Sequence, residues 1–583
     1  MQKGFPHPRW SLAEYTPPPK PGFPRGTIDR LADFGYDHLV KIAIGQINPK
    51  VGDFSENLGK IRESVAQAQE AGADLVVFPE LALLGYPPRD LLLRRGFVEA
   101  AEAAFQEVLK ESTKMPIVIG HIRPASPRPA NRADPSANSW HPYFLHNVVF
   151  LLDGGEILGF QAKVRLPSFD VFEEERYFVP GERCEVLTWR GLRLGLSVCE
   201  DFWYEDGVLA AQSQAGVDLL LNVSASPYFR GKPSVRWRLG QAWAAQAGVP
   251  LVYANLVGAQ DELVFDGRSF IVRPDGAFLL DCPAFREGVF LADLAGAPGA
   301  PPREAGIADV YRALVLGIRD YCQKNGIPRV VIGISGGVDS AVVAALAVEA
   351  LGKENVIGAF LPGPYTSAVS RECAQALAEN LGIKLLVLSI NAAFEEAKRA
   401  LGAAIPVEGV VAENLQARLR GLFLMALANA LEAIVLCPGN KAEIAMGYNT
   451  LYGDTVGALA PIGDLLKHEV YELARFLNEK AGHPLIPEEI LRRPPSAELR
   501  PDQKDEDDLP PYSILDPLLK ALVEANASPE ELAQRFEAAL VREVLRRLRR
   551  AEYKRRQLPL VLKVSPKAFG LGWRFPVTSG FLD

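Results

Sequence analysis

Short apolar runs alternate with longer segments of helical spacing along the second half of the chain. The runs are rich in β-branched residues, which is typical of buried parallel strands, and they fall near 329–334, 356–361, 384–390 and 433–437. After the first run, apolar residues recur at helical spacing through an alanine-rich segment that ends near Gly352. This alternation predicts an α/β domain built on a doubly wound parallel sheet.

The first half has more strands and a less regular alternation. Its apolar runs predict strands at 40–44, 75–78, 117–119, 192–196, 219–223 and 251–254. Turns rich in Asp, Gly and Pro at 153–155 and 274–276 predict two hairpins. Helical segments at 57–71 and 98–111 lie between the early strands, so we expect a mixed α/β layer structure here.

Two domains joined by a short linker are expected from the length of the chain. Its 583 residues exceed what one hydrophobic core ordinarily organises. Segment 295–308 is rich in Gly, Pro and Ala, so we expect it to link domains at 39–294 and 309–583. Residues 1–38 are proline-rich with little periodicity and are expected to form an irregular N-terminal arm.

The composition is that of an ordinary globular protein, with 48% hydrophobic and 23% charged residues. A net charge of −8 argues against a nucleic-acid partner, because such partners favour basic surfaces. No apolar run reaches membrane-spanning length and no signal peptide opens the chain, so no membrane partner is expected. The six cysteines form no CxxC pair and no metal-ligand cluster, which predicts reduced thiols and a cytoplasmic protein.

A glycine- and serine-rich turn follows the first strand of the second half. It consists of Ser335, Gly336, Gly337, Val338, Asp339 and Ser340. Its backbone N–H groups, its hydroxyls and the positive end of the following helix favour binding of a phosphate or pyrophosphate. Asp339 would repel such an anion unless a cation lay between them, so we predict a bound Mg²⁺. The chain contains neither a GxxxxGK[ST] nor a GxGxxG motif, so neither the common phosphate loop nor a reducing dinucleotide site is indicated.

Three chemically active side chains follow predicted structural elements of the first half. Glu80 and Cys199 each end a strand, and Lys163 follows the hairpin that turns at 153–155. If they converge, the carboxylate can draw off the thiol proton, and the ammonium can stabilise both a thiolate and an oxyanion. Such a set suits acyl transfer from an amide through a thioester. An isolated cysteine at a strand end, by contrast, ordinarily belongs to the core.

Longer runs of the second half resemble the NAD synthetases. The turn at 335–340 is similar to the pyrophosphate loop of ATP pyrophosphatases. Runs that match NAD synthetase in order and spacing lie at 413–418, 438–443, 447–454, 461–467, 494–499, 503–507 and 551–556. The resemblance implies that this half binds ATP, deamido-NAD and Mg²⁺.

The same resemblance assigns roles to individual residues of the second half. ATP is expected at the turn 335–340, Pro438 and Lys467, and Mg²⁺ at Asp339 and Glu443. The residues implied for deamido-NAD are Asn414, Glu443, Asn449, Asp454 and Lys554. Pro438 departs from the family, which usually has a threonine that contacts ATP at this place. Because proline has neither a hydroxyl nor an N–H, that contact is lost or replaced.

Motifs of the first half resemble the nitrilase superfamily, specifically the glutaminase domain fused to NAD synthetase. They lie at 78–80, 163–167, 172–178 and 199–201. The resemblance implies an α-β-β-α sandwich with Glu80 as proton acceptor, Lys163 as charge-stabilising group and Cys199 as nucleophile. It also implies that Glu174 supports the lysine and the leaving ammonia, and that the backbone N–H of Glu200 contributes to the oxyanion hole.

The glutamine-binding positions implied by this resemblance are Phe169, Ser226 and Lys232. Phe169 is the second departure, because the family commonly offers a tyrosine hydroxyl to glutamine there. A missing hydrogen bond of this kind weakens binding by about 0.5–1.5 kcal/mol. We therefore expect poor glutamine affinity, or another group that substitutes for the hydroxyl.

Together the two resemblances imply a glutamine-dependent NAD synthetase. In that family, ammonia released from glutamine passes through an enclosed channel to AMP-activated deamido-NAD, and the chains assemble as homo-oligomers, often octamers. Two alternatives stay open. One is an ammonia-dependent NAD synthetase with a weak or inactive amidase domain, and the other is an ATP-pyrophosphatase amidotransferase that acts on a different acid.

Overall fold

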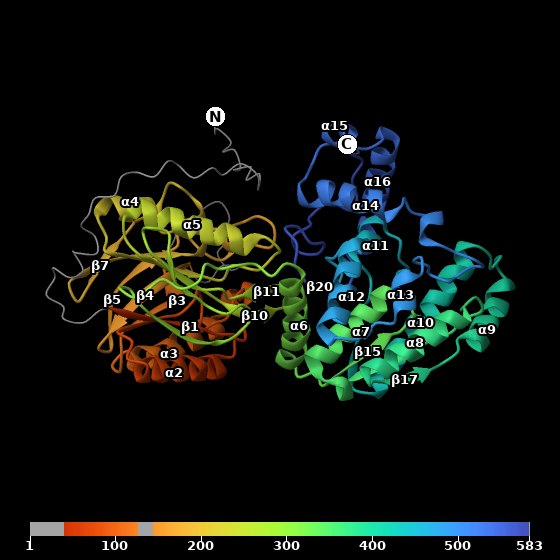
Figure 1. Cartoon of the computed structure of the whole chain (residues 1–583), viewed down its shortest axis with the longest axis horizontal. Coiled ribbons are helices and arrows are strands. Elements are labelled where there is room, and N and C mark those ends of the chain that lie inside the picture. The colour runs from red at the N-terminus through yellow and green to blue at the C-terminus, as the bar shows by residue number, and fades with distance from the viewer. Residues whose placement is uncertain (1–39, 126–143, 582–583) are drawn as a thin grey trace.

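The computed structural model describes residues 40–125 and 144–581, which form two halves on either side of helix α6 (Ile307–Lys324) (Figure 1). The expected arm at 1–38 lies outside the described residues. Within the described residues, no helix has the length and apolar character needed to cross a membrane.

The first half contains two six-stranded sheets. One has the order β14-β1-β2-β3-β4-β5 and the other β13-β12-β9-β8-β7-β6. The strands of the first sheet are β14 (Gly288–Asp293), β1 (Lys41–Gln46), β2 (Leu75–Val77), β3 (Ile117–Pro124), β4 (Leu145–Asp153) and β5 (Glu156–Ala162). Those of the second are β13 (Phe278–Asp281), β12 (Phe270–Val272), β9 (Leu251–Asn255), β8 (Leu219–Ser224), β7 (Leu192–Val198) and β6 (Val186–Trp189). The predicted hairpins are confirmed as β4–β5 and β12–β13.

Helices cover both outer faces of these sheets. α2 (Phe54–Glu70) and α3 (Arg95–Glu111) lie on one side of the strands, and α4 (Val208–Ala215) and α5 (Lys232–Ala247) on the other (Figure 1). Side chains such as Ile44, Leu196 and Leu221 from the two sheets form one buried cluster, because alternate residues of each strand point inward. The predicted α-β-β-α sandwich is therefore confirmed.

The second half is built on one parallel sheet with the order β17-β16-β15-β18-β19-β20. Its strands are β15 (Arg329–Gly333), β16 (Val356–Phe360), β17 (Lys384–Val387), β18 (Ala433–Leu436), β19 (Leu459–Ala460) and β20 (Leu560–Val561). α7 (Val338–Leu351) is apolar nearly all round and is buried. The predicted doubly wound sheet is confirmed, although the strand expected at 384–390 ends at Val387, before α9 (Asn391–Gly402) begins.

Further helices complete the second half. They are α8 (Ala368–Leu381), α10 (Val410–Ala430), α11 (Lys441–Met446), α12 (Lys467–Ala481), α13 (Glu488–Arg492), α14 (Tyr512–Leu519), α15 (Pro529–Ala533), α16 (Ala538–Arg550) and α17 (Glu552–Arg555). The helices α14, α15 and α16 stand away from the sheet at one end of the molecule (Figure 1).

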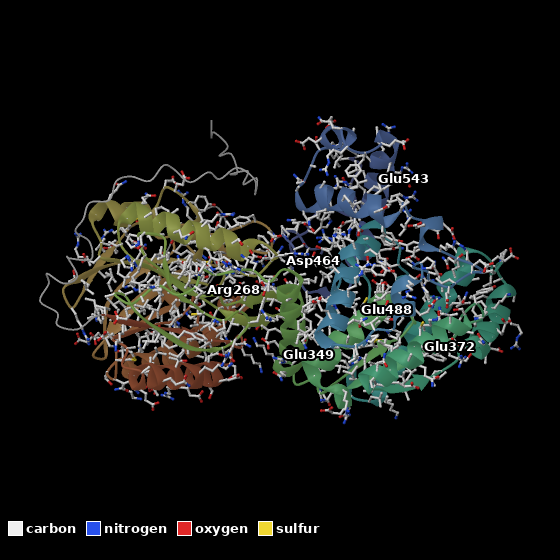
Figure 2. The ribbon with its side chains drawn as sticks, in the orientation of Figure 1. Arg268, Glu349, Glu372, Asp464, Glu488 and Glu543 are labelled. Carbon is white, nitrogen blue, oxygen red and sulfur yellow. The ribbon has the colours of Figure 1, made fainter. Side chains whose placement is uncertain are left out.

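The two halves are joined through α6 by buried polar contacts. Arg268, labelled in Figure 2, donates from its guanidinium to Asp309 Oδ2 at 2.7 Å, and Asp309 is fully buried. Further along the helix, Asp320 accepts from the Asn48 side chain at 2.8 Å and from the Ala259 backbone at 2.6 Å. Because unpaired buried charges are costly, these contacts fix the relative placement of the halves.

Two candidate active sites

Cys199 begins a short 3₁₀ turn (Cys199–Trp203) where β7 ends. Its φ of 41° lies in the left-handed region, which costs a non-glycine residue energy and is common at functional positions. The side chain is 4% exposed. The strand end thus presents the thiol from a sharp turn inside the first half.

The predicted partners of Cys199 meet around the ammonium of Lys163. Its Nζ lies 2.8 Å from Glu80 Oε1 and 2.7 Å from Glu174 Oε1, and all three side chains are buried. The structure therefore brings together Glu80, Lys163 and Glu174, and the charges of all three act on the Cys199 thiol.

Two positioning contacts in this cluster were missed by the sequence analysis. Tyr86 donates its hydroxyl to Glu174 Oε1 at 2.8 Å, and Asn147 donates its amide to Glu80 Oε1 at 2.6 Å. The other oxygen of Glu80 accepts the backbone N–H of Ala225 at 2.8 Å. Glu80 is thereby held in one orientation by donors from three separate elements.

Burial governs the proton affinities in this cluster. Burial, with the nearby Glu80 carboxylate, raises the pKa of Cys199 well above its ordinary value, and Lys163 only partly offsets this. Burial also disfavours a charged Lys163, but Glu174 and Glu80 outweigh it and raise the pKa of the lysine. Burial raises the pKa of Glu174 to about 7. The resting site therefore holds a neutral thiol beside the Lys163 ammonium, which Glu80 and Glu174 contact.

Two of the implied glutamine-binding residues, Ser226 and Lys232, border this cluster. Ser226 is buried, and its Oγ has no hydrogen-bond partner among the described residues, so it can bind a ligand. The ammonium of Lys232 lies 5.5 Å from the centre of the Trp203 ring and 5.3 Å from that of Phe229, and burial lowers its pKa to about 8. Phe169 is 42% exposed, on the loop that leads to Glu174.

The second site is a cavity of about 280 Å³ at the carboxyl ends of β15 and β18. All six residues of the turn 335–340 line it. The hydroxyls of Ser335 and Ser340 lie 3.1 Å apart, and Gly336 has a φ of 84°. A Cβ on Gly336 would come within 2.5 Å of the Ser370 carbonyl oxygen, so only glycine fits there.

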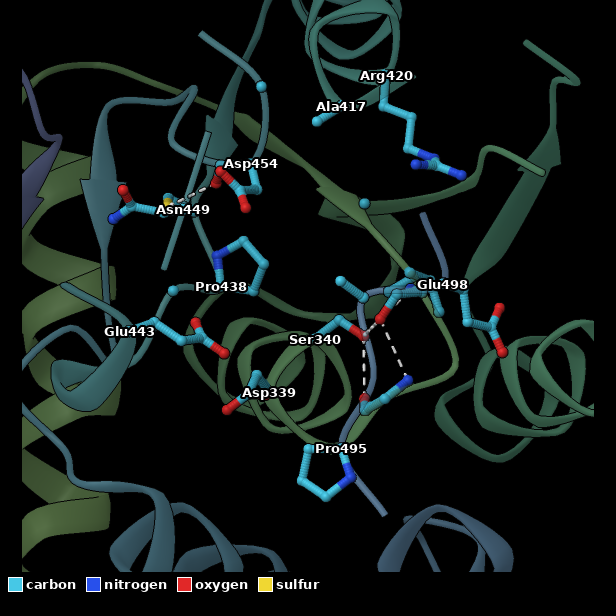
Figure 3. A pocket seen from close by; sticks show the side chains of 18 of the residues that line it. Asp339, Ser340, Ala417, Arg420, Pro438, Glu443, Asn449, Asp454, Pro495 and Glu498 are labelled. Carbon is cyan, nitrogen blue, oxygen red and sulfur yellow. Dashed lines mark hydrogen bonds between the residues drawn. The ribbon is translucent and has the colours of Figure 1, made fainter. Parts of the chain in front are cut away.

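Asp339 and Glu443 lie close together on one wall of this cavity (Figure 3). Lys467, which also lines the cavity, contacts both carboxylates. Lys467 Nζ lies 2.5 Å from Asp339 Oδ2 and 3.8 Å from Glu443 Oε1. Burial and the Asp339 charge raise the pKa of Glu443. Burial disfavours a charged Lys467, but Asp339 and Glu443 outweigh it and raise its pKa.

The two carboxylates fit a Mg²⁺ ion. Mg²⁺ is held in nucleotide sites by one or two carboxylates together with substrate phosphates, and the mutual repulsion of Asp339 and Glu443 favours a shared cation. In the described part of the chain, no group of three or more His, Cys, Asp or Glu side chains is arranged to hold a metal. The remaining ligands would therefore have to come from phosphate oxygens or water.

The other predicted residues divide into two groups. Pro438, Asn449 and Asp454 line the cavity, as Figure 3 shows. Asn414 and Lys554 are not among its lining residues. Asn414 Oδ1 accepts from the Thr450 hydroxyl at 2.7 Å, and Lys554 donates to the carbonyl of Asn449 at 2.6 Å. Both therefore support the 447–454 loop in this structure, and their contact with a nucleotide stays a prediction.

Two further residues of this cavity were missed by the sequence analysis. Arg420 lies on the opposite wall from Asp339 (Figure 3), and burial lowers its pKa. Glu498 accepts from the hydroxyls of Ser367 at 2.8 Å and Ser370 at 2.7 Å, which fixes the 494–499 loop over the cavity. The run at 494–499, which the sequence analysis named, contains Glu498, so that residue could have been found there. Arg420 could not, because the apolar residues of its helix, α10, occupy more than one face and do not indicate which side faces a cavity.

The fold and its two sites define an amidotransferase, in which a nitrilase-type amidase is fused to a nucleotide-dependent synthetase. Residues 41–297 match the carbon-nitrogen hydrolase family and residues 310–558 the NAD synthase family. Glutamine-dependent NAD(+) synthetases from Synechocystis sp. and Thermotoga maritima are 41% and 39% identical to this chain, each across 93% of it and 99% of the relative. The chain belongs to the family of glutamine-dependent NAD(+) synthetases.

A solved structure agrees with this assignment. The glutamine-dependent NAD+ synthetase from Acinetobacter baumannii, in complex with ADP, is 34% identical with a TM-score of 0.72. The similarity covers 93% of this chain and 99% of that one. The chain is thus a glutamine-dependent NAD+ synthetase with a nitrilase-like glutaminase half and an NAD synthase half. The amidotransferase alternative with a different acid is not supported.

Proposed function

We propose that Cys199 releases ammonia from glutamine and that the cavity at the 335–340 turn uses it to amidate deamido-NAD at the expense of ATP. The observation that carries this proposal is the convergence of Glu80 and Glu174 on Lys163 around the buried Cys199 thiol. The Asp339–Lys467 pair beneath the glycine turn supplies the matching second site.

Glutamine hydrolysis follows from the protonation states of the first site. Glu80 takes the Cys199 proton as the sulfur attacks the carboxamide carbon, and the oxyanion is stabilised by the Lys163 ammonium and the backbone N–H of Glu200. Glu80 then gives this proton to the leaving nitrogen. The C–N bond breaks, ammonia departs, and the thioester on Cys199 remains. Water, deprotonated by Glu80, cleaves the thioester to glutamate and restores the thiol. Glu174, which accepts from the Tyr86 hydroxyl, holds Lys163 in place throughout.

The second site forms the amide. The nicotinate carboxylate attacks the α-phosphorus of ATP, and pyrophosphate leaves. Ammonia then attacks the acyl carbon, and AMP leaves with the carboxyl oxygen. Lys467 and the N–H groups of the 335–340 turn stabilise the charge that develops on the phosphates. Asp339 and Glu443 would hold Mg²⁺, which neutralises phosphate charge when bound.

A chain of buried polar groups that leads from the glutaminase site to helix α6 supports direct transfer of ammonia. Several buried polar atoms there have no hydrogen-bond partner among the described residues: Ser226 Oγ, Tyr253 Oη, Arg236 Nη1, Asp266 Oδ1 and Tyr228 Oη. Arg236 lies over the Tyr253 ring and pairs with Asp266, and the charge of Asp309 on α6 acts on Tyr228. Such unpaired groups indicate room for small polar molecules. A passage would keep ammonia from being protonated in bulk water.

An apolar stripe on α10 supports assembly into homo-oligomers, for which the family predicts octamers. Val411, Leu422 and Met425 are 38%, 61% and 42% exposed. With the half-buried Leu415 they lie on one face of the helix, at helical spacing, and Arg418 is the polar residue within the stripe. A stripe of this kind on the surface favours burial against a second copy of the chain.

The cysteines support a cytoplasmic enzyme. All six are free thiols in the structure. Free thiols persist in reducing compartments, and small-molecule substrates account for the glutaminase site and the nucleotide cavity.

Replacing Cys199 by alanine tests the proposal. Glutamine-driven NAD+ formation should vanish, whereas ammonium-driven formation should persist near the wild-type rate. Amide-¹⁵N glutamine should label the nicotinamide in the wild type. If the wild type makes NAD+ only from ammonium, the enzyme is the ammonia-dependent alternative and the proposed role of Cys199 is wrong.

A further inference from the structure

The first turn of α12 carries Lys467 into the nucleotide cavity, and it is fixed by a residue from another helix. His468 is the second residue of α12, and its backbone N–H donates to Asp516 Oδ2 at 2.8 Å. The Nδ1 atom of the same histidine lies 2.8 Å from the same oxygen. One carboxylate oxygen therefore accepts from the backbone and the side chain of the residue next to Lys467.

Asp516 is placed at this position despite an energetic cost. The residue is 1% exposed, and its Oδ1 has no hydrogen-bond partner among the described residues. A half-satisfied buried carboxylate is unfavourable, so a purely structural contact would be served better by a neutral side chain. An anion at this position instead satisfies an N–H that the first turn of a helix leaves unpaired, and it complements the helix dipole.

The contact also joins α12, whose first residue lines the cavity, to α14, whose first residue contacts the cavity residue Asp505. Tyr512, the first residue of α14, donates to Asp505 Oδ2 at 3.0 Å, and its ring centre lies 5.5 Å from Lys467 Nζ. Asp516 lies one turn further along α14. The pair it forms with His468 therefore holds the start of α12 against α14, with Lys467 facing the cavity and the Tyr512 ring beside Lys467.

We propose that Asp516 and His468 are positioning residues for Lys467, which set the place of its ammonium relative to the phosphates of the bound nucleotide. This inference rests on the proposed function, because it acts through Lys467 in the adenylation step. His468 is half-exposed and is not among the residues that line the cavity, so its influence runs through the helix start.

The test uses ammonium-driven NAD+ formation by the full-length enzyme, with ATP varied at saturating deamido-NAD. His468→Ala should lower kcat roughly tenfold with KM for ATP within twofold, because small misplacements of a charge-stabilising group act on the transition state. His468→Asn should recover most of the loss, since its amide nitrogen is attached at Cγ, as Nδ1 is, and can replace that N–H donor. His483→Ala, an exposed histidine just beyond the other end of α12, is the matched control and should be unchanged.

A double-variant comparison separates positioning from general stability. In a Lys467→Arg background, His468→Ala should cause little further loss, because the group that it positions has already been displaced. Asp516→Asn keeps an acceptor for the backbone N–H of His468, so its kcat should lie between those of the wild type and His468→Ala. Wild-type kcat in His468→Ala, or an undiminished effect in the Lys467→Arg background, would overturn the proposal. A wild type that makes NAD+ from neither glutamine nor ammonium would instead overturn the proposed function.

Discussion

Asp170 in the glutaminase half and Lys563 in the synthetase half form an ion pair across the domain boundary, with Oδ2 and Nζ 3.1 Å apart. Lys563 is 3% exposed, and its ammonium also donates to the carbonyl oxygens of Ser565 and Pro566. Asp170 directly follows Phe169 and lies four residues before Glu174. The pair therefore ties the loop that completes the glutaminase site to the last strand and tail of the synthetase half.

Replacing Asp170 by asparagine should weaken both stability and glutamine use. Loss of the charge leaves a buried ammonium poorly compensated, which costs about 1–3 kcal/mol. Because the loop carries Glu174, glutamine-driven synthesis should fall further than ammonium-driven synthesis. Calorimetry measures the melting temperature, and the rates of glutamine-driven and ammonium-driven NAD+ formation are compared between Asp170→Asn and the wild type. Asp206→Asn, which removes an exposed pair with Arg165, is the control and should leave the melting temperature nearly unchanged. Equal losses in both rates would contradict a role for the loop.

Restoring a hydroxyl at position 169 should improve glutamine binding. Phe169 packs edge-on against Phe172, with ring centres 5.7 Å apart, and it is 42% exposed. Tyrosine keeps this packing and adds a donor, which is worth about 0.5–1.5 kcal/mol, or roughly a two- to tenfold lower KM for glutamine. The KM for ATP in the ammonium-driven reaction should stay the same. An unchanged KM for glutamine would mean that another group already fills the place of the hydroxyl.

The strand ends of both halves could be predicted from the sequence, because topology fixes them. Buried parallel strands place their carboxyl ends at one edge of a sheet, and ligands bind at that edge. Cys199 and the turn at 335–340 each follow the carboxyl end of such a strand, so both could be predicted as functional positions. Motif resemblance then supplied Lys163 and Glu174, and in the structure Glu80 and Glu174 both contact the Lys163 ammonium.

Contacts between distant segments could not be predicted in this way. Tyr86 reaches Glu174 across 88 positions, and Asn147 reaches Glu80 across 67, and neither leaves a local pattern in the sequence. For Lys467 the local sequence suggests the wrong environment. Its charge-rich surroundings are typical of a solvated surface, yet the fold buries it beside Asp339 and Glu443.

His121 should make the glutaminase half sensitive to acid. It is fully buried against Phe105, with ring centres 4.5 Å apart, and burial lowers its pKa to about 3. The unfolded chain binds this proton near pH 6.5, so folding is unimpaired above that pH and loses stability as the pH falls toward 3. The loss amounts to about 2 kcal/mol at pH 5.

Replacing His121 by phenylalanine should remove this part of the pH dependence. The free energy of unfolding should then change by about 2 kcal/mol less between pH 7 and pH 5 than in the wild type. Urea titrations at pH 7 and pH 5 measure this change in the free energy of unfolding. Any effect of the substitution on packing is the same at both pH values and cancels from the difference. His483→Gln, at an exposed histidine, should keep the wild-type slope. An unchanged slope in His121→Phe would show that the histidine is protonated in the folded state.

A charge in the apolar stripe of α10 should prevent the proposed homo-oligomer from forming. Leu422 is 61% exposed and stands between Val411 and Met425 on the same face of the helix. If this face packs against a second copy, Leu422→Glu buries a carboxylate without a partner, which costs several kcal/mol at each contact. Sedimentation velocity should then show a smaller species, with the melting temperature of the monomer little affected because the side chain is exposed there. Gln106→Glu adds the same charge on α3, at an exposed position of the glutaminase half, and should leave the sedimentation coefficient as it is. A wild type that already sediments as a monomer, or a Leu422→Glu variant that sediments like the wild type, would mean that this stripe is not the contact between copies.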